Sequence, residues 1–142
     1  MPQRDFILRL IEEMGRALAE IRRRILGGEL SGPRVREEVD RALVGVGLDL
    51  DLALRASPET LELMIASTGE VDPTRAWVLA ESLYVYGLGA EAEGQTHLAR
   101  TAFERAHRLF TLLAPSAAFY GLVEAEGRQE ELEERLRSLA DG

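Results

Sequence analysis

Hydrophobic residues recur at helical spacing along most of the chain, beginning with a helix expected from Asp5 to Leu26. Apolar residues in this helix alternate steps of four and three positions for almost three heptads, which is typical of a coiled-coil seam. The seam consists of Ile7, Ile11, Met14, Leu18, Ile21 and Ile25. Phe6, Leu10 and Ala17 broaden the apolar stripe, which favours packing in a bundle. The seam therefore either mediates self-association, as in a homodimer, or covers the core of its own chain.

The stretch from Trp77 to Leu113 predicts two antiparallel helices packed around small residues. Asp72 can cap the first of them, and Pro73 suits its first turn. Small residues on this helix face a mixed stripe on the next, so the two axes can approach closely, with Phe103 in the gap. Gly94 lies where the chain must reverse, as glycine often does just after a helix end. The pattern indicates a helix hairpin.

This hairpin resembles one unit of a tetratricopeptide repeat, a helix pair found in scaffolds that hold other proteins. The resemblance rests on residues at matching spacing: Leu83, Tyr86, Gly87, Ala90, Gly94, Ala99, Phe103 and Ala106. A weaker copy follows 33 residues later, with Gly127 as its reversal glycine, so the similarity extends from Trp77 to Leu139. An aromatic residue is usual where Leu83 stands, and the closing proline comes late, at Pro115. The opening segment, Arg4 to Glu29, resembles the start of an uncharacterised family of small, all-helical bacterial proteins.

Cap residues predict shorter helices between these two parts. Pro33, after Ser31 and Gly32, begins one helix, and Ser57 begins another that closes near Gly69. The alternation from Leu48 to Leu54 is a strand pattern by periodicity alone. We favour a helix there, because an isolated strand would leave its backbone unpaired and because Leu and Ala favour helices.

After the hairpin, Ser116 is expected to cap a further helix, and Gly127 to separate it from a last one. The sequence thus predicts one all-α domain over residues 1–142, a right-handed array of six or seven helices. Its N-terminal helices occupy residues 1–70, and tetratricopeptide-like helix pairs occupy residues 72–140.

Composition narrows the function classes. The net charge of −8 over 142 residues opposes nonspecific binding to nucleic acid or to anionic membranes. The absence of cysteine excludes disulfides, thiolate zinc sites and cysteine nucleophiles. Charges interrupt the N-terminal segment, so no signal peptide is predicted, and no stretch has membrane-spanning length. We expect a soluble, cytoplasmic, bacterial protein.

Arg22, Arg23 and Arg24 form a basic run that suggests a nucleic-acid-associated regulator as one alternative function. Three successive residues spread over most of a helix turn, however, and cations near a helix C-terminus are favoured by the macrodipole. The more economical interpretation is a positive end that meets the acidic segment of the same chain, residues 37–82, which holds ten acidic residues and three arginines.

The candidates for a metal site are few. Glu104 and His107 have the Glu-x-x-His spacing of di-iron helix bundles, which need a second such pair that this chain lacks. His97 and His107 point about 80° apart on one helix. A small helical ligand- or metal-binding bundle is therefore a second alternative. No catalytic triad order or phosphate-binding loop is present, so we expect no enzyme, no catalytic or metal residues and no cofactor.

The leading expectation is a non-enzymatic module for protein–protein interaction or scaffolding, which self-associates. One stripe of the first hairpin helix carries the candidate protein-binding residues Trp77, Glu81, Tyr84, Leu88 and Glu91. The repeat resemblance implies that Tyr84, Leu88 and Glu91 face a groove that takes a peptide or a partner helix. The alternative is that Trp77 and Tyr84 pack under the N-terminal helices of their own chain.

Overall fold

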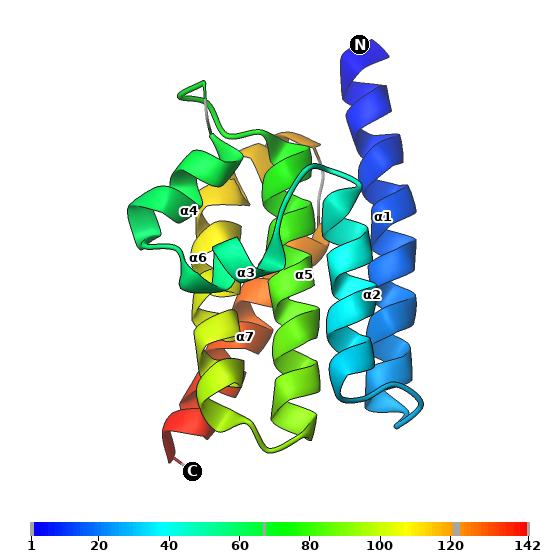
Figure 1. The fold of residues 1–142 in the computed structure, drawn as a ribbon. Helices are drawn as coiled ribbons and strands as arrows, with labels where there is room; N and C mark the ends of the chain where they lie inside the picture. The colour runs from blue at the N-terminus through cyan, green and yellow to red at the C-terminus, as the bar shows by residue number, and fades with distance from the viewer. Residues whose placement is uncertain (1, 67, 121–122, 142) are drawn as a thin grey trace.

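The computed structural model describes the backbone of residues 2–66, 68–120 and 123–141, and the side chains of residues 6, 8–66, 68–115 and 127–140. Seven α-helices lie within these residues (Figure 1), which confirms the predicted all-α class and helix number. They are α1 (Pro2–Leu26), α2 (Pro33–Val44), α3 (Leu50–Arg55), α4 (Pro58–Ile65), α5 (Pro73–Ala92), α6 (Thr96–Tyr120) and α7 (Val123–Asp141).

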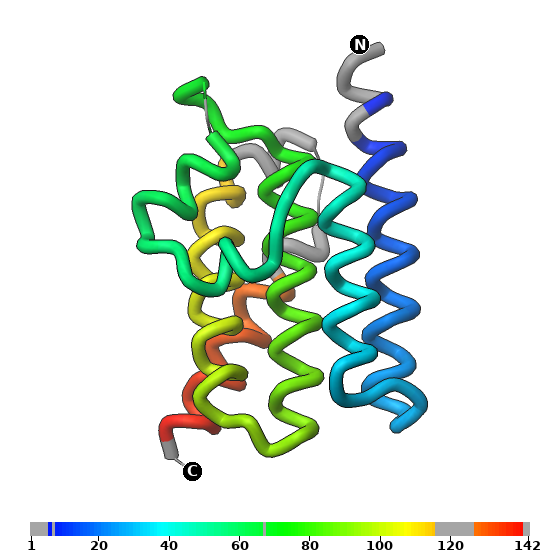
Figure 2. The backbone as a smooth tube through the Cα atoms, viewed as in Figure 1, coloured from blue at the N-terminus to red at the C-terminus, as the bar shows by residue number. Residues whose placement is uncertain are grey.

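The long helices run alternately down and up, with α5 in the middle and the short helices α3 and α4 against one side (Figures 1 and 2). Helix α5 packs against α6, α1 and α2, and α7 packs against α6. Fifteen of the twenty residues of α5 are buried. A helix that is apolar on nearly every face is stable only when neighbours surround it, so α5 is the core of the molecule.

Side-chain caps fix where the helices begin. The Asp72 carboxylate accepts hydrogen bonds from the backbone N–H groups of Thr74 and Arg75 at the start of α5. Asp49 accepts from Leu52 N at the start of α3, and Ser57 accepts from Thr60 N at the start of α4. Each cap supplies a partner for N–H groups that the helix itself cannot satisfy. The Asp49 cap explains why the alternating leucines form a helix, as predicted, and not a strand.

The predicted hairpin is present as α5 and α6, joined by a turn in which Gly94 has a φ of 74°. Gly87 allows the close approach of the two helices, because a Cβ atom there would overlap the ring of Phe103. On the other side of α5, a Cβ atom on Gly89 would stand 2.8 Å from Cγ1 of Val35 in α2. Glycine thus lets α5 sit close to both neighbours.

The predicted helix boundaries after the hairpin are wrong. Pro115 and Ser116 lie inside α6, and Gly127 lies inside α7, so neither Ser116 nor Gly127 marks a helix end. A proline interrupts only the hydrogen bond of its own nitrogen and crowds one carbonyl, which a well-packed helix can tolerate. Glycine within a helix costs about 1 kcal/mol relative to alanine, so it weakens α7 without ending it.

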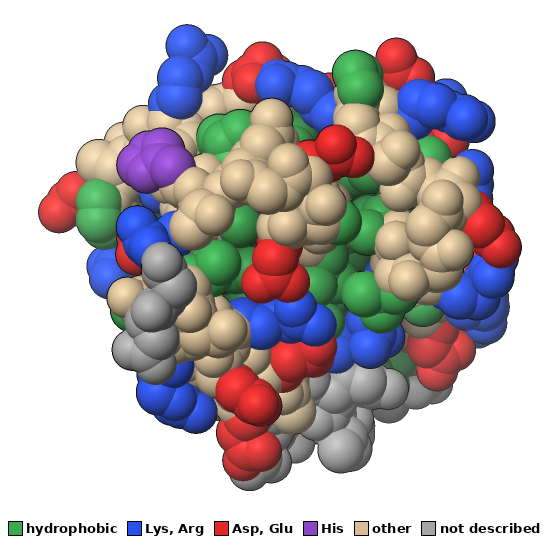
Figure 3. Space-filling model, turned by 90° about the horizontal axis from the view of Figure 1, so that it is seen from below, with side chains coloured by type: hydrophobic (Ala, Val, Ile, Leu, Met, Phe, Trp, Pro, Cys, Tyr) green, Lys and Arg blue, Asp and Glu red, His purple; other side chains and the backbone are tan. Residues whose placement is uncertain are grey.

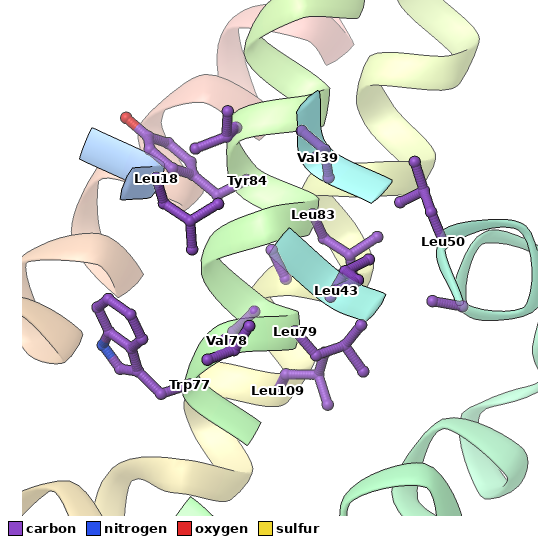
Figure 4. Close-up of a cluster of buried hydrophobic side chains, with 14 of the residues drawn as sticks. Leu18, Val39, Leu43, Leu50, Trp77, Val78, Leu79, Leu83, Tyr84 and Leu109 are labelled. Carbon is purple, nitrogen blue, oxygen red and sulfur yellow. The ribbon is translucent and has the colours of Figure 1, made fainter. Parts of the chain in front are cut away.

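The apolar seam of α1 covers the core of its own chain. Ile11, Leu18, Ile21 and Ile25 are buried, and Met14 is partly buried against that core. Figure 4 shows Leu18 together with the buried side chains of α2, α5 and α6. The side chain of Ile7 lies outside the described residues. Self-association through this seam would require the protein to open, so the predicted homodimer would need another surface.

Within the described residues, no helix combines the length and the apolar character that crossing a membrane requires.

Candidate functional site: a groove between α1, α5 and α7

The stripe of α5 predicted to bind a partner is buried within the chain. Trp77, Glu81, Tyr84 and Leu88 are 6%, 4%, 0% and 2% exposed, and Glu91 is partly exposed. Trp77 and Tyr84 leave α5 on the side opposite Leu79 and Leu83 (Figure 4), where α1 and the long side chains of α7 meet them. The alternative interpretation of these two aromatic residues is therefore the one observed, and a partner could reach the stripe only at its edge.

That edge is a groove of about 520 Å³ which is open along one side. One wall is a single face of α1, the floor is α5, and Arg128 of α7 closes the far side. The lining residues are Leu8, Ile11, Glu12, Gly15, Arg16, Ala19, Arg22, Trp77, Glu81 and Arg128. Its size lies within the range of sites that bind small molecules and short peptide segments.

The α1 wall changes character along its length. From Leu8 to Arg22 the helix rises about 21 Å, at 1.5 Å per residue. The upper part presents Leu8, Ile11 and Glu12, the middle presents Arg16 and the small residues Gly15 and Ala19 beside Trp77, and Arg22 lies at the lower end. The groove thus has aliphatic side chains at its upper end and a cluster of charged residues at its lower end, with Glu12 and Arg16 between them.

A buried ion pair forms the charged end. Arg128 donates from Nε to Glu81 Oε1 at 2.5 Å and from Nη2 to Glu81 Oε2 at 3.3 Å. The side chains of Glu81 and Arg128 are only 5% and 16% exposed. Two parallel hydrogen bonds between a guanidinium and a carboxylate are among the strongest polar contacts in proteins. They hold α7 against α5 where the helix axes themselves stand apart.

Tyr84 and Glu131 extend this cluster. The Tyr84 hydroxyl donates to Glu131 Oε1 at 2.5 Å, and Arg128 Nη1 donates to Glu131 Oε2 at 3.2 Å. The Arg128 guanidinium also lies 4.6 Å from the centre of the Tyr84 ring, a cation–π distance. Farther down α7, Arg135 Nη1 donates to Glu91 Oε1 at 2.5 Å. Polar side chains thus join α7 to α5, and the buried Leu132 of α7 adds to the common core.

Burial sets the protonation behaviour of the cluster. It raises the pKa of Glu81, although the hydrogen bonds from Arg128 oppose the shift. Burial and the hydrogen bond to Glu131 raise the pKa of Tyr84 to about 12. For Glu131, burial acts to raise the pKa, but the Tyr84 hydroxyl and the charges of Arg128 and Arg135 outweigh it and leave the pKa lowered.

Arg22 is the exception in this cluster. Its Nε is buried and makes no hydrogen bond, and within the described part of the chain its guanidinium forms no ion pair. Arg22 lines the same groove as Glu81 and Arg128, and its positive charge acts to lower the pKa of Glu81 and of Glu131. Arg23, by contrast, is exposed and bonded to Glu20 and Glu29. The basic run is therefore divided between the groove and the solvent, as its helical spacing predicts.

The predicted metal-site candidates lie elsewhere. His107 Nε2 is 3.0 Å from Glu133 Oε1, between α6 and α7. Glu104 and His97 are exposed. Over the described residues, no three His, Cys, Asp or Glu side chains gather closely enough to hold a metal ion.

A second hollow lies at the lower end of the molecule, where α2 and α6 begin and α5 ends. Its volume is about 480 Å³, and Pro33, Val35, Ala90 and Leu98 contribute to its lining. Figure 3 views this end and shows hydrophobic side chains interrupted by charged ones. Glu93 crosses between two loops here by accepting a hydrogen bond from Gly32 N at 3.2 Å. The hollow lacks the buried ionic groups that distinguish the first groove.

Sequence reasoning identified the floor of the groove but missed its walls. Trp77 and Glu81 were predicted site residues, whereas Arg22 was assigned to a positive end that meets the acidic segment of the same chain, and Arg128 was not singled out. A signal for the α1 wall existed, because Leu8, Gly15, Ala19 and Arg22 share one helical stripe beside the buried seam. No such signal pairs Arg128 with Glu81, 47 positions apart.

Compared with models of known protein families, with curated proteins and with solved structures, the chain matches none of them. The resemblance of α5 and α6 to a tetratricopeptide unit stays a prediction.

Proposed function

We propose that this protein is a non-enzymatic interaction module that binds a segment of a partner protein in the groove between α1, α5 and α7. The observation that carries the proposal is the composition of the groove: a tryptophan floor, small residues on one wall, and arginines at one end. Binding sites for peptides commonly combine an apolar, aromatic surface with a few placed polar groups.

The surroundings of the groove favour a binding role over a catalytic one. Glu81 and Arg128 are engaged with each other, and Tyr84 and Glu131 are engaged in the same network. Each of these groups already has a partner, so none is poised to exchange a proton with a substrate. A rigid floor with an open side suits recognition, because little of the protein needs to be ordered when a ligand arrives.

The test is a selection of peptides from a random display library on the folded protein. Ala19→Trp places a large ring in the groove, while Ala17→Trp adds the same ring to the opposite face of α1. Ala17 and Ala19 are both exposed, so either variant should fold. Selected peptides should bind the wild type and Ala17→Trp alike, and should bind Ala19→Trp about tenfold more weakly or worse.

The protein also supplies its own reporter. It has a single tryptophan, Trp77, on the groove floor, so its fluorescence should respond when a selected peptide binds. Peptides that bind Ala19→Trp as tightly as the wild type, or a selection that yields no binder, would contradict the proposal.

A further inference from the structure

We infer that the groove recognises an acidic side chain of the partner segment, and that Arg22 is the residue that binds its carboxylate. This inference rests on the proposed function and specifies its ligand chemistry. The segment would carry an Asp or Glu a few residues from an aromatic or aliphatic side chain.

The hydrogen-bonding state of Arg22 is the first argument. A buried N–H group without an acceptor is energetically costly, and more so when it belongs to a charged group. Nε of Arg22 is such a donor, in a residue that lines the groove. A carboxylate is the acceptor that guanidinium groups bind best, through two parallel hydrogen bonds. A carboxylate that binds the Arg22 guanidinium would break no hydrogen bond within the described residues.

The local charges select a monoanion. Arg128 is already shared by Glu81 and Glu131, so it adds little attraction for an incoming anion. Arg22 makes no ion pair within the described residues, so its guanidinium is the one at this end that can bind a carboxylate. A phosphate group carries −1.5 to −2 charges, and the neighbouring carboxylates of Glu81 and Glu131 would repel it. The overall charge of −8 disfavours a polyanion such as nucleic acid for the same reason.

The distance between Trp77 and Arg22 along the groove sets the spacing between the apolar and the acidic side chain of the ligand. Gly15, against which the Trp77 ring packs, lies seven residues before Arg22, about 10 Å along the helix. An extended peptide covers that distance in about three residues. We therefore expect an apolar side chain near Trp77 and an acidic one three positions away.

The experiment uses four acetylated tetrapeptides and the cross-peak of the Trp77 indole N–H in nitrogen-15 spectra. Two peptide amides place Glu and Phe at opposite ends, in the two orders Glu-Gly-Ser-Phe and Phe-Ser-Gly-Glu. The third is Gln-Gly-Ser-Phe amide, which lacks the charge, and the fourth is Gln-Gly-Ser-Phe with a free C-terminal acid. Because the protein has one tryptophan, the indole cross-peak is assigned without further work. Each peptide is titrated into the wild type, Arg22→Gln, Arg23→Gln and Ala19→Trp.

We expect one of the two Glu peptides to bind the wild type about tenfold more tightly than the Gln amide, and that advantage to vanish in Arg22→Gln. Arg23→Gln removes the same charge from an exposed neighbour and should keep the advantage. Equal affinities of the Glu and Gln amides, both weakened by Ala19→Trp, would overturn the carboxylate inference and leave the groove function standing.

Three further results would also overturn it. Tighter binding of the free-acid peptide than of both Glu amides would assign the site to a chain terminus and not to an acidic side chain. No response to any peptide would refute the inference, while the display selection decides the groove function independently. An equal loss in Arg22→Gln and Arg23→Gln would mean that only the overall charge of α1 matters.

Discussion

The indole ring of Trp77 lies directly against the backbone of Gly15. A Cβ atom built on Gly15 would stand 2.9 Å from Cη2 of the ring, closer than real Cβ contacts come. Glycine at this position therefore lets α1 lie over α5 with the tryptophan between them. The same contact forms the middle of the groove, so the packing of two helices and the candidate binding site depend on one small residue.

Gly15→Ala should destabilise the fold by about 1 kcal/mol. Alanine in a helix gains about 1 kcal/mol over glycine, but forcing a methyl group into the buried indole costs about 1–3 kcal/mol. Gly127→Ala is the matched control, because a Cβ atom at Gly127 meets nothing within 4 Å and should stabilise α7 by up to about 1 kcal/mol. Denaturant unfolding of both variants measures the difference, and equal stabilisation of the two would mean that the Gly15–Trp77 contact is loose.

Leu18→Ala should lower the free energy of unfolding by about 2–5 kcal/mol, because Leu18 is fully buried in the core. Leu26, at the end of the same helix, is 58% exposed, and Leu26→Ala should change stability by less than about 0.5 kcal/mol. Denaturant unfolding and light scattering, carried out on the same samples, show whether the seam of α1 is a core face of its own chain or an interface between two copies. If Leu18→Ala dissociated a dimer into folded, equally stable monomers, the seam would be an interface and not a core face.

The sequence predicts the elements of this fold better than their arrangement. Cap residues such as Asp49, Ser57 and Asp72 act through contacts two or three positions away, so their effect is visible in a linear pattern. A stripe of apolar residues, in contrast, shows that one face of a helix is buried, but it does not show which helix or which molecule buries it. The α1 seam could have met a second copy or α5, and only the three-dimensional packing distinguishes these.

Polar contacts between distant helices are the least predictable part. From the sequence, Glu81 is expected at the exposed edge of an aromatic stripe. In the structure it is buried, and Arg128 of α7 binds its carboxylate. A charged residue at a buried position is acceptable only with a partner, and the partner can lie on any neighbouring helix. Similarly, the sequence places Arg22 on a helical stripe beside the buried seam, but it does not show which helix lies against that stripe; the packing of α1 on α5 decides this.

Arg128→Met should destabilise the fold by about 3–5 kcal/mol, because it leaves the Glu81 carboxylate buried without its partner. Adding Glu81→Gln should recover part of that loss, because no buried charge is then left uncompensated. Arg135→Met is the control: Arg135 and Glu91 are 27% and 32% exposed, so this change should cost about 1 kcal/mol or less. Unfolding free energies of the single and double variants close a double-mutant cycle.

The pH dependence of Arg128→Met gives a second readout. Burial raises the pKa of Glu81 above its ordinary value of 4.5, and losing Arg128 removes the main influence that opposes the shift. At pH values above 4.5 the unfolded chain is ionised while the folded carboxyl holds its proton, so the variant should gain stability relative to Glu81→Gln/Arg128→Met as pH falls towards 4.5. Parallel pH profiles of these two variants would show that the Glu81 carboxylate reaches water once Arg128 is gone.

Tyr84 should make the fold sensitive to alkali. Its pKa is raised from 10.0 to about 12, so between these values the unfolded chain loses its phenolic proton while the folded chain keeps it. Stability from this residue is complete below pH 10 and falls as pH rises towards 12, by about 2–3 kcal/mol in all. The window is unusually clear, because the sequence has no lysine or cysteine and arginine stays protonated throughout it.

Tyr84→Phe should be about 1 kcal/mol less stable at neutral pH, since Glu131 loses a hydrogen bond, but should lose much less stability between pH 10 and 12. Tyr86→Phe, two positions along the same helix, should keep the decline that Tyr84 causes. Unfolding at a series of pH values measures the slopes, and a Tyr84→Phe slope equal to that of the wild type would place the Tyr84 hydroxyl in contact with solvent.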